Sequence, residues 1–193
     1  MSASHDNRIS LPAREELTPE QAEAYERIAS GPRGKVEGPL AIWLHSPQLA
    51  DRAQLLGEFA RYKTSFEPRL SELAILVTAR HWTSHFEWAI HAPIAEKAGV
   101  SPTVIAAIKL GQTPDFGSKD EAAVHGFVSE LLTTGKISDA GLAKARALFG
   151  DKGAVELSAI VGYYSTCAFA IALAEPVLPD GTRECLPPLK LKA

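Results

Sequence analysis

Prolines at the heads of successive helix-period segments constrain the fold of this chain most strongly. The stretches "LTPEQ", "SPQLADRAQLLGEF", "EPRLSELAILV" and "SPTVIAAIKL" each place a proline just before residues that recur with helical spacing. Proline suits the first position of a helix because its missing N–H group would have no partner there. In the first stretch, Thr18 and Gln21 also have the spacing of a capping box. We find no convincing period-2 strand, so the sequence predicts an all-α protein of about seven to eight helices.

Apolar spacing inside these segments indicates where the helices run. From Pro47 to about Lys63, four residues follow the spacing of an amphipathic helix: Leu49, Ala53, Leu56 and Ala60. The segment that opens with Pro68 carries a broad apolar face and is expected to be a core helix. Further helices are expected at "SKDEAAVHGFVSELLTTG", at "SDAGLAKARALFG" and from about Lys152 to Ala174.

Length and composition predict one domain with a sizeable core. The chain has 193 residues, of which 46% are hydrophobic and 22% are charged. These are the proportions of a soluble globular protein. We expect residues 1–16 to be a loose segment, residues 17–176 to form a single all-α domain, and residues 177–193 to be a Pro-rich tail.

Charge, hydropathy and cysteine usage exclude several classes of function. The net charge is −3 and the charges are interspersed, so no basic stripe is available for nucleic acid. The N-terminus lacks a signal-peptide core and no apolar run approaches the roughly 18 residues of a spanning helix, so we expect a cytoplasmic protein without a membrane partner. Cys167 and Cys185 match neither a disulfide framework nor a metal site, and we expect two reduced thiols.

The polar stretch "TSHFEWAIH" is the strongest candidate for a functional site. If a helix starts near Ser84, a rotation of about 100° per residue places Ser84, Glu87 and His91 on one face. An adjacent strip is expected to contain His81, His85 and Trp88. A cleft lined by these groups would hold proton donors, an acceptor and a flat apolar wall.

The same residues also have structural interpretations. Ser84 and Glu87 fit a capping box, in which each side chain accepts a hydrogen bond from the backbone N–H of the other residue. Glu87 and His91 are four residues apart and fit a surface pair that stabilises a helix by about 0.2–0.5 kcal/mol. Trp88 fits a core residue. From spacing alone, an active site and a capped helix both remain open.

A metal site is a weaker interpretation of the histidines. His81 and His85 have the i, i+4 spacing of two zinc ligands, and Glu87 or His91 could add a third. However, the expected helix boundary falls between His81 and His85, and no cysteine lies nearby. We therefore predict no metal.

The spacing of Glu72, Ser84, Glu87 and His91 matches a known motif. Alkylhydroperoxidase-D-like proteins carry a Glu, eleven further residues, and then Cys-x-x-Cys-x-x-x-His; counting from Glu72, the register fits without a gap. The form Glu-Trp-x-x-His after "ELAILVTARHWTSHF" resembles the carboxymuconolactone decarboxylase family of the same superfamily. The resemblance covers residues 45–110 well and extends to the helices up to about residue 175.

This resemblance implies an alkylhydroperoxidase-D-like helical bundle that assembles as a homo-oligomer, as a dimer, trimer or hexamer. Ser84 and Glu87 stand at the two cysteine positions, and neither supplies the thiolate or resolving thiol of a dithiol peroxidase. The family resemblance implies decarboxylation of a small carboxylated lactone such as 4-carboxymuconolactone, in aromatic catabolism. No metal, flavin or pyridoxal cofactor is required, because the unsaturated lactone itself accepts the electrons left by CO2.

Roles in such a reaction follow from the side-chain chemistry. His91 is the expected proton donor, since an imidazole titrates near neutral pH. Glu87 or Glu72 would fix the tautomer of His91, and Ser84 or His85 would donate to the developing oxyanion.

Substrate contacts are expected from neighbouring residues. His81, His85 and Trp88 would line the pocket, with Trp88 as a dry wall that favours loss of the charged carboxylate. The substrate carboxylate needs a cation, and Arg80 is the nearest in sequence. The other candidate cations are Arg52, Arg61 and Arg69.

Two alternatives remain beside the lyase. One is a thiol peroxidase or redox protein that uses Cys167 or a thiol of a partner. The other is a non-catalytic binding or scaffold protein, in which the polar helix start is only a capping box.

Overall fold

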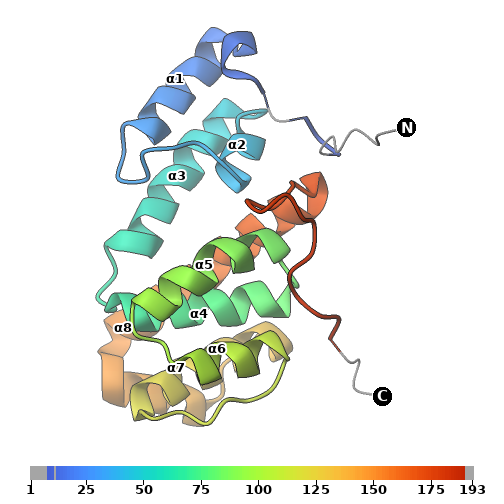
Figure 1. The fold of residues 1–193 in the computed structure, drawn as a ribbon. Coiled ribbons are helices and arrows are strands. Elements are labelled where there is room, and N and C mark those ends of the chain that lie inside the picture. The colour runs from blue at the N-terminus through green and yellow to red at the C-terminus, as the bar shows by residue number, and fades with distance from the viewer. Residues whose placement is uncertain (1–7, 11, 190–193) are drawn as a thin grey trace.

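The computed structural model describes residues 8–10 and 12–189, and every regular element within them is helical, which confirms the predicted all-α fold (Figure 1). The described residues form eight α-helices, within the predicted number. The elements are η1 (Arg14–Glu16), α1 (Pro19–Ala29), α2 (Pro39–Trp43), α3 (Pro47–Tyr62), α4 (Pro68–His81), α5 (His85–Lys97), α6 (Pro102–Lys109), α7 (Lys119–Thr134) and α8 (Asp139–Ala174).

The helices that the sequence predicts to begin at a proline do so in the structure. α1, α3, α4 and α6 each begin at a proline. The capping box of α1 is complete, because the Gln21 N–H donates to Thr18 Oγ1 at 3.3 Å and the Thr18 N–H donates to Gln21 Oε1 at 2.9 Å. The short helix α2 was not predicted, since its five residues are too few to show a helical period.

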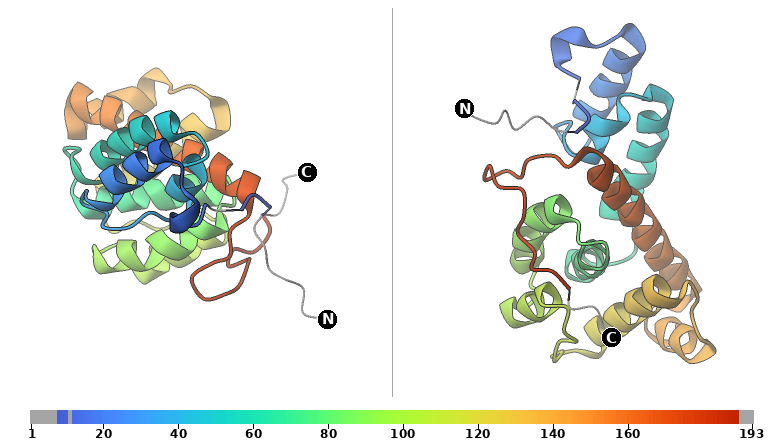
Figure 2. Two further views of the ribbon diagram at one scale, coloured as in Figure 1. Left: turned by 90° about the horizontal axis from the view of Figure 1, so that it is seen from above. Right: turned by 90° about the vertical axis from the view of Figure 1, so that its right-hand side faces the viewer.

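The long helix α8, with 36 residues, extends from one end of the molecule to the other. Figures 1 and 2 show it running from the end formed by α6 and α7 to the end formed by α1 and α2. Its first part is offset from the rest at Gly150, whose φ of 68° and ψ of −179° are not helical. The two helices predicted on either side of this glycine are therefore both present, joined by a kink.

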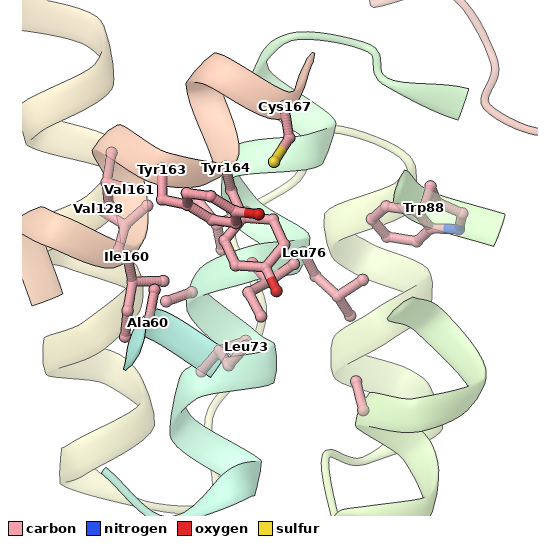
Figure 3. Close-up of a cluster of buried hydrophobic side chains, with 14 of the residues drawn as sticks. Ala60, Leu73, Leu76, Trp88, Val128, Ile160, Val161, Tyr163, Tyr164 and Cys167 are labelled. Carbon is pink, nitrogen blue, oxygen red and sulfur yellow. The ribbon is translucent and has the colours of Figure 1, made fainter. Parts of the chain in front are cut away.

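α4 and α8 form the centre of the core. Every residue of α4 from Leu70 to Arg80 is buried. Figure 3 shows Tyr163 and Tyr164 of α8 between Cys167 and Leu73, in one cluster with Leu76 of α4. A helix that is buried on all sides also takes its polar residues into the core, which sets the position of the candidate site.

The apolar stripe predicted for α3 is right at Ala60, which is fully buried, but over the earlier turns the buried face is shifted by one residue. Leu49 and Leu56 are about half exposed, at 46% and 49%, whereas Gly57 lies on the buried face. The reason is a close approach: a Cβ atom at Gly57 would overlap the hydroxyl of Tyr163 and the guanidinium of Arg33. Small residues therefore face α8, and the leucines face outward.

The ends of the described chain pack against the helices. The backbone N–H of Arg8 donates to the carbonyl of Ala174 at 2.9 Å, and Arg8 forms an ion pair with Glu175 at 3.0 Å. After α8 the chain crosses the start of α5, where the backbone N–H groups of Cys185 and Leu186 both donate to a histidine of α5. Parts of the expected loose segment, residues 1–7 and 11, and of the expected tail, residues 190–193, lie outside the described residues.

α8 is also long and apolar enough to cross a membrane by length and composition, so the expectation that no apolar run approaches this length is wrong. Of its most apolar window, 56% is buried inside the protein. The core helix of a soluble protein meets the same criterion, and the burial of α8 is consistent with a soluble protein.

We predict that Gly57→Ala destabilises the fold by about 1–3 kcal/mol, because the added methyl group must displace Tyr163 or Arg33 from a packed crossing. The matched control is Gly126→Ala on α7, where an added Cβ meets open space. This control should gain up to about 1 kcal/mol from helix propensity alone. Urea unfolding of both variants checks the prediction, and equal effects at the two glycines would contradict the close approach of α3 to α8.

Candidate active site

A buried hydrogen bond between an acid and an imidazole joins α4 to α5. His91 Nδ1 lies 2.7 Å from Glu72 Oε2, and each residue is only 5% exposed. Glu72 is buried because the whole of α4 is buried, and His91 lies on the side of α5 that meets α4. Since a buried carboxylate without a partner is costly, the two groups satisfy each other. The bond orients the ring of His91 through Nδ1, and the other ring nitrogen, Nε2, makes no contact with Glu72.

His91 borders a hollow of about 70 Å³ that is open on one side. The hollow is formed by α2 and the connection before it, together with α3, α5 and α8. Its lining residues are Arg33, Lys35, Glu37, Pro39, Leu40, Arg61, Phe86, Glu87, Ile90, His91, Tyr163, Tyr164 and Cys167.

Glu87 is a second buried acid in this hollow, and it is unpaired. It is 3% exposed, and neither carboxyl oxygen has a hydrogen-bond partner among the described residues. Burial raises the pKa of the Glu87 carboxyl to about 8, and the nearby Ser84 hydroxyl opposes this rise. At neutral pH Glu87 is therefore mainly a neutral carboxylic acid, which can donate a hydrogen bond.

The predicted capping box of Ser84 and Glu87 is wrong. Ser84 is the N-cap of α5, but its side chain makes no capping bond, and Ser84 Oγ is buried without a partner among the described residues. The backbone of Ser84 holds the turn instead, because its N–H donates to the carbonyl of Ala79 at 2.8 Å and its carbonyl accepts from the N–H of Trp88 at 3.0 Å. Glu87 and His91 do not form the predicted surface pair either, since both are buried.

Aromatic and sulfur groups of α8 close the inner side of the hollow. The ring of Tyr164 meets the ring of His91 edge to face, with centroids 5.1 Å apart and an interplanar angle of 89°. Burial raises the pKa of the Tyr163 and Tyr164 hydroxyls, so both are neutral phenols. Burial also raises the pKa of the Cys167 thiol well above its usual value, which keeps this sulfur protonated.

Cations stand at the open side of the hollow. Arg33 Nη2 donates to the Tyr163 hydroxyl at 3.3 Å, and Arg61 lies 5.2 Å from the centre of the Tyr62 ring. Within the described part of the chain, neither guanidinium forms an ion pair with a carboxylate. Lys35, in contrast, pairs with Glu37 at 2.6 Å. An anion that enters the hollow therefore meets two guanidinium groups that have no acid partner.

Several predicted site residues lie elsewhere. Thr83, with a φ of 51°, reverses the chain between α4 and α5, so residues before this turn do not share the face of His91. Arg80 and His81 border a different hollow with His125. Trp88 is a core residue at 3% exposure and does not line the hollow.

The C-terminal segment forms hydrogen bonds to His85. Its Nδ1 accepts hydrogen bonds from the backbone N–H groups of Cys185 and Leu186, each at 3.1 Å. Burial lowers the pKa of His85, which suits a ring nitrogen that must remain an acceptor. His85 and Ser84, the expected oxyanion donors, do not line this hollow, whereas Glu87 does.

Of the alternative cations, only Arg61 lines the hollow. Arg52 Nη1 donates to the carbonyl of Gln48 at 2.9 Å. Arg69 pairs with Asp120 at 2.7 Å and with Glu121 at 2.8 Å, and it holds the pKa of the Asp120 carboxyl at about 2. Arg69 thus links α4 to α7 through ion pairs.

Sequence reasoning missed three contributors to the site. Arg33 comes from the Gly- and Pro-rich connection "SGPRGKVEGP", a type of segment that often carries binding residues. Tyr163 and Tyr164 come from "GYYSTC" on α8, where two adjacent aromatic residues in a run of small residues were the available signal.

No group of three His, Cys, Asp or Glu side chains that could hold a metal ion exists among residues 8–10 and 12–189. The two cysteines in this part of the chain are both free thiols.

No protein-family model matches the chain, and a search of curated proteins finds no match either. The resemblance to the carboxymuconolactone decarboxylase family remains a prediction from the register of Glu72, Glu87 and His91.

We predict that Glu87→Gln removes a specific pH dependence of stability. From about pH 4.5, the usual pKa of this carboxyl, up to about pH 8, the unfolded chain loses a proton that folded Glu87 keeps. The wild-type free energy of unfolding therefore falls as pH rises through this window, by up to about 1.4 kcal/mol per pH unit. Glutamine does not titrate, so the variant should be more stable than wild type at pH 8 and similar at pH 4.5.

Urea unfolding between pH 4.5 and 8 measures this difference, with Glu156→Gln as the matched control. Burial raises the pKa of Glu156, but hydrogen bonds from the Ser65 N–H and hydroxyl, at 2.6 and 2.5 Å, lower it overall. The control should therefore lose stability at neutral pH. Parallel pH profiles for wild type and Glu87→Gln would show that Glu87 is ionised in the fold.

Proposed function

We propose that this chain is a cofactor-independent carboxy-lyase that acts on a small carboxylated, unsaturated lactone such as 4-carboxymuconolactone. The observation that carries the proposal is the buried Glu72–His91 pair at the wall of a hollow whose open side holds two guanidinium groups without acid partners. The pair offers a positioned imidazole for proton transfer, and the guanidinium groups offer a site for a carboxylate.

The chemistry of decarboxylation matches these groups. When the carbon–carbon bond to the carboxylate breaks, CO2 leaves, and the electron pair moves through the ring double bond to the lactone oxygen. The resulting dienolate needs a stabilised oxygen and one proton on carbon. His91 would react as the imidazolium, with a proton on each ring nitrogen: it would deliver the Nε2 proton to carbon and keep the Nδ1 proton, which Glu72 accepts in a hydrogen bond. A proton from water then restores His91.

Glu87 suits the stabilisation of the oxyanion. Because Glu87 is neutral and unpaired, its carboxyl proton is free to bond to the dienolate oxygen. A carboxylic acid in an apolar site can donate in this way at neutral pH. Arg33 and Arg61 would hold a carboxylate that remains on the substrate, at the open side of the hollow.

The thiol-based alternative has less support. A dithiol reaction needs a thiolate beside a resolving thiol, but Cys167 is the one cysteine that lines this hollow. Burial raises the pKa of its thiol, which opposes formation of the thiolate. The scaffold alternative rested on the capping box of Ser84 and Glu87, whose side chains do not form it.

A homo-oligomer and a cytoplasmic location are part of the same proposal. The outward side of α8 from Val155 to Leu173 carries no charged residue, and Val155, Phe169 and Leu173 are each more than half exposed, at 68%, 53% and 56%. Such an uncharged side suits contact with a second copy. The proposed partner is a small carboxylated molecule, with no role for nucleic acid or a membrane.

We predict that His91→Gln lowers kcat for lactone decarboxylation by about a hundredfold or more, the usual contribution of a positioned general acid. Arg33→Gln should mainly raise KM, because Arg33 would bind the substrate rather than the transition state alone. Loss of ultraviolet absorbance together with released CO2 measures turnover. His45→Gln is the control, since His45 is exposed and lies outside the hollow. No turnover of any carboxylated lactone by wild type, or full turnover by His91→Gln, would overturn the proposal.

A cysteine-free variant separates the lyase from a thiol peroxidase. Cys167→Ala with Cys185→Ala should keep decarboxylation within a few-fold of wild type, because no thiol takes part in the proposed reaction. Peroxide reduction by wild type that disappears in this variant, without any lactone turnover, would instead support the redox alternative.

A further inference from the structure

A second hollow of about 290 Å³ lies between α4 and α7, lined by none of the residues of the candidate active site. We propose that it binds a small oxyanion, a carboxylate or a phosphate, through Arg80. The polar residues around it include Arg80, His81, His125 and Ser129, and no aspartate or glutamate lines it.

The burial of Arg80 carries the proposal. Arg80 is 4% exposed and is the only buried arginine among the described residues. Its Nη2 donates to the carbonyl of Pro187 at 2.7 Å, but Nε and Nη1 are buried and have no hydrogen-bond partner among the described residues. A guanidinium stays charged in proteins, and a buried charge without a partner is costly. The fold therefore holds a positive charge that its own side chains do not neutralise.

Arg69, another arginine of α4, has the acid partners that Arg80 lacks. Arg69 is more exposed, yet it pairs with Glu67, Asp120 and Glu121. Arg80 forms no ion pair within the described part of the chain. An anion in the hollow beside Arg80 would supply the missing charge.

The surroundings of Arg80 indicate the class of ligand. A guanidinium has five N–H donors in a planar array that matches the oxygens of a carboxylate or phosphate. His81 and His125 can each add a ring N–H, and Ser129 adds a hydroxyl. Leu189 gives one part of the hollow an apolar surface. The site thus fits a compact anion rather than an extended polyanion, for which the chain has no basic stripe.

NMR of the full-length protein labelled with ¹⁵N-arginine tests the proposal. The Nε–H signal of Arg80 is identified by its loss in Arg80→Lys. Titration with sodium phosphate and, separately, with sodium acetate, at ionic strength held constant with sodium chloride, should shift this signal saturably and raise Tm. Saturation by phosphate alone assigns a phosphate ligand, and saturation by acetate alone assigns a carboxylate. No saturable shift of Arg80 with either anion would overturn the proposal.

Variants separate this hollow from the candidate active site. Arg80→Lys should weaken anion binding, measured through Tm, by roughly tenfold, because charge-assisted hydrogen bonds are lost. Arg33→Lys and Arg52→Lys should leave the Arg80 shift unchanged, because neither residue lines this hollow. If Arg80→Lys does not fold, His125→Gln serves in its place, with an expected weakening of several-fold. Unchanged binding in the variant that folds would place the anion elsewhere and overturn the proposal.

Discussion

The hydrogen bond between Glu72 and His91 is the interaction on which the candidate site depends. α4 is buried on all sides, so the Glu72 carboxylate has no access to bulk water and needs a partner inside the protein. His91 provides it at 2.7 Å from the neighbouring helix. This contact joins α5 to α4. Glu87, one turn earlier on α5, lines the same hollow as His91, Tyr163 and Tyr164.

Two acids of similar burial thus acquire different properties. Glu72 is bonded to an imidazole, whereas Glu87 has no partner among the described residues and holds its proton at neutral pH. Different environments for paired acids are a usual way to separate a positioning role from a donor role. The guanidinium groups of Arg33 and Arg61 add positive charge at the open side. In the proposed decarboxylation, the guanidinium groups would bind the carboxylate beside these proton donors.

The helices could be predicted from sequence more fully than the site. Proline at the first position marks the four predicted helix starts, and Gly150 marks the kink of α8, because both effects are local. The sequence left two partners of His91 open, Glu87 on the same helix and Glu72 on the preceding one, and the packing of α4 against α5 makes Glu72 the partner. Arg33, Tyr163 and Tyr164 come from distant segments, and only the close crossing of α3 and α8 at Gly57 brings them together. Contacts that tertiary packing creates in this way leave no periodic signal in the sequence.

The most direct test of the account is ¹⁵N NMR of the His91 ring. At neutral pH, Nδ1 should carry a proton held by Glu72, and this state should change in Glu72→Gln. Addition of an unsaturated lactone acid should then shift the Nε2 signal and leave the Nδ1 bond in place. A ring that averages between tautomers like an exposed histidine, with neither nitrogen responding to the acid, would contradict both the buried pair and its role beside the hollow.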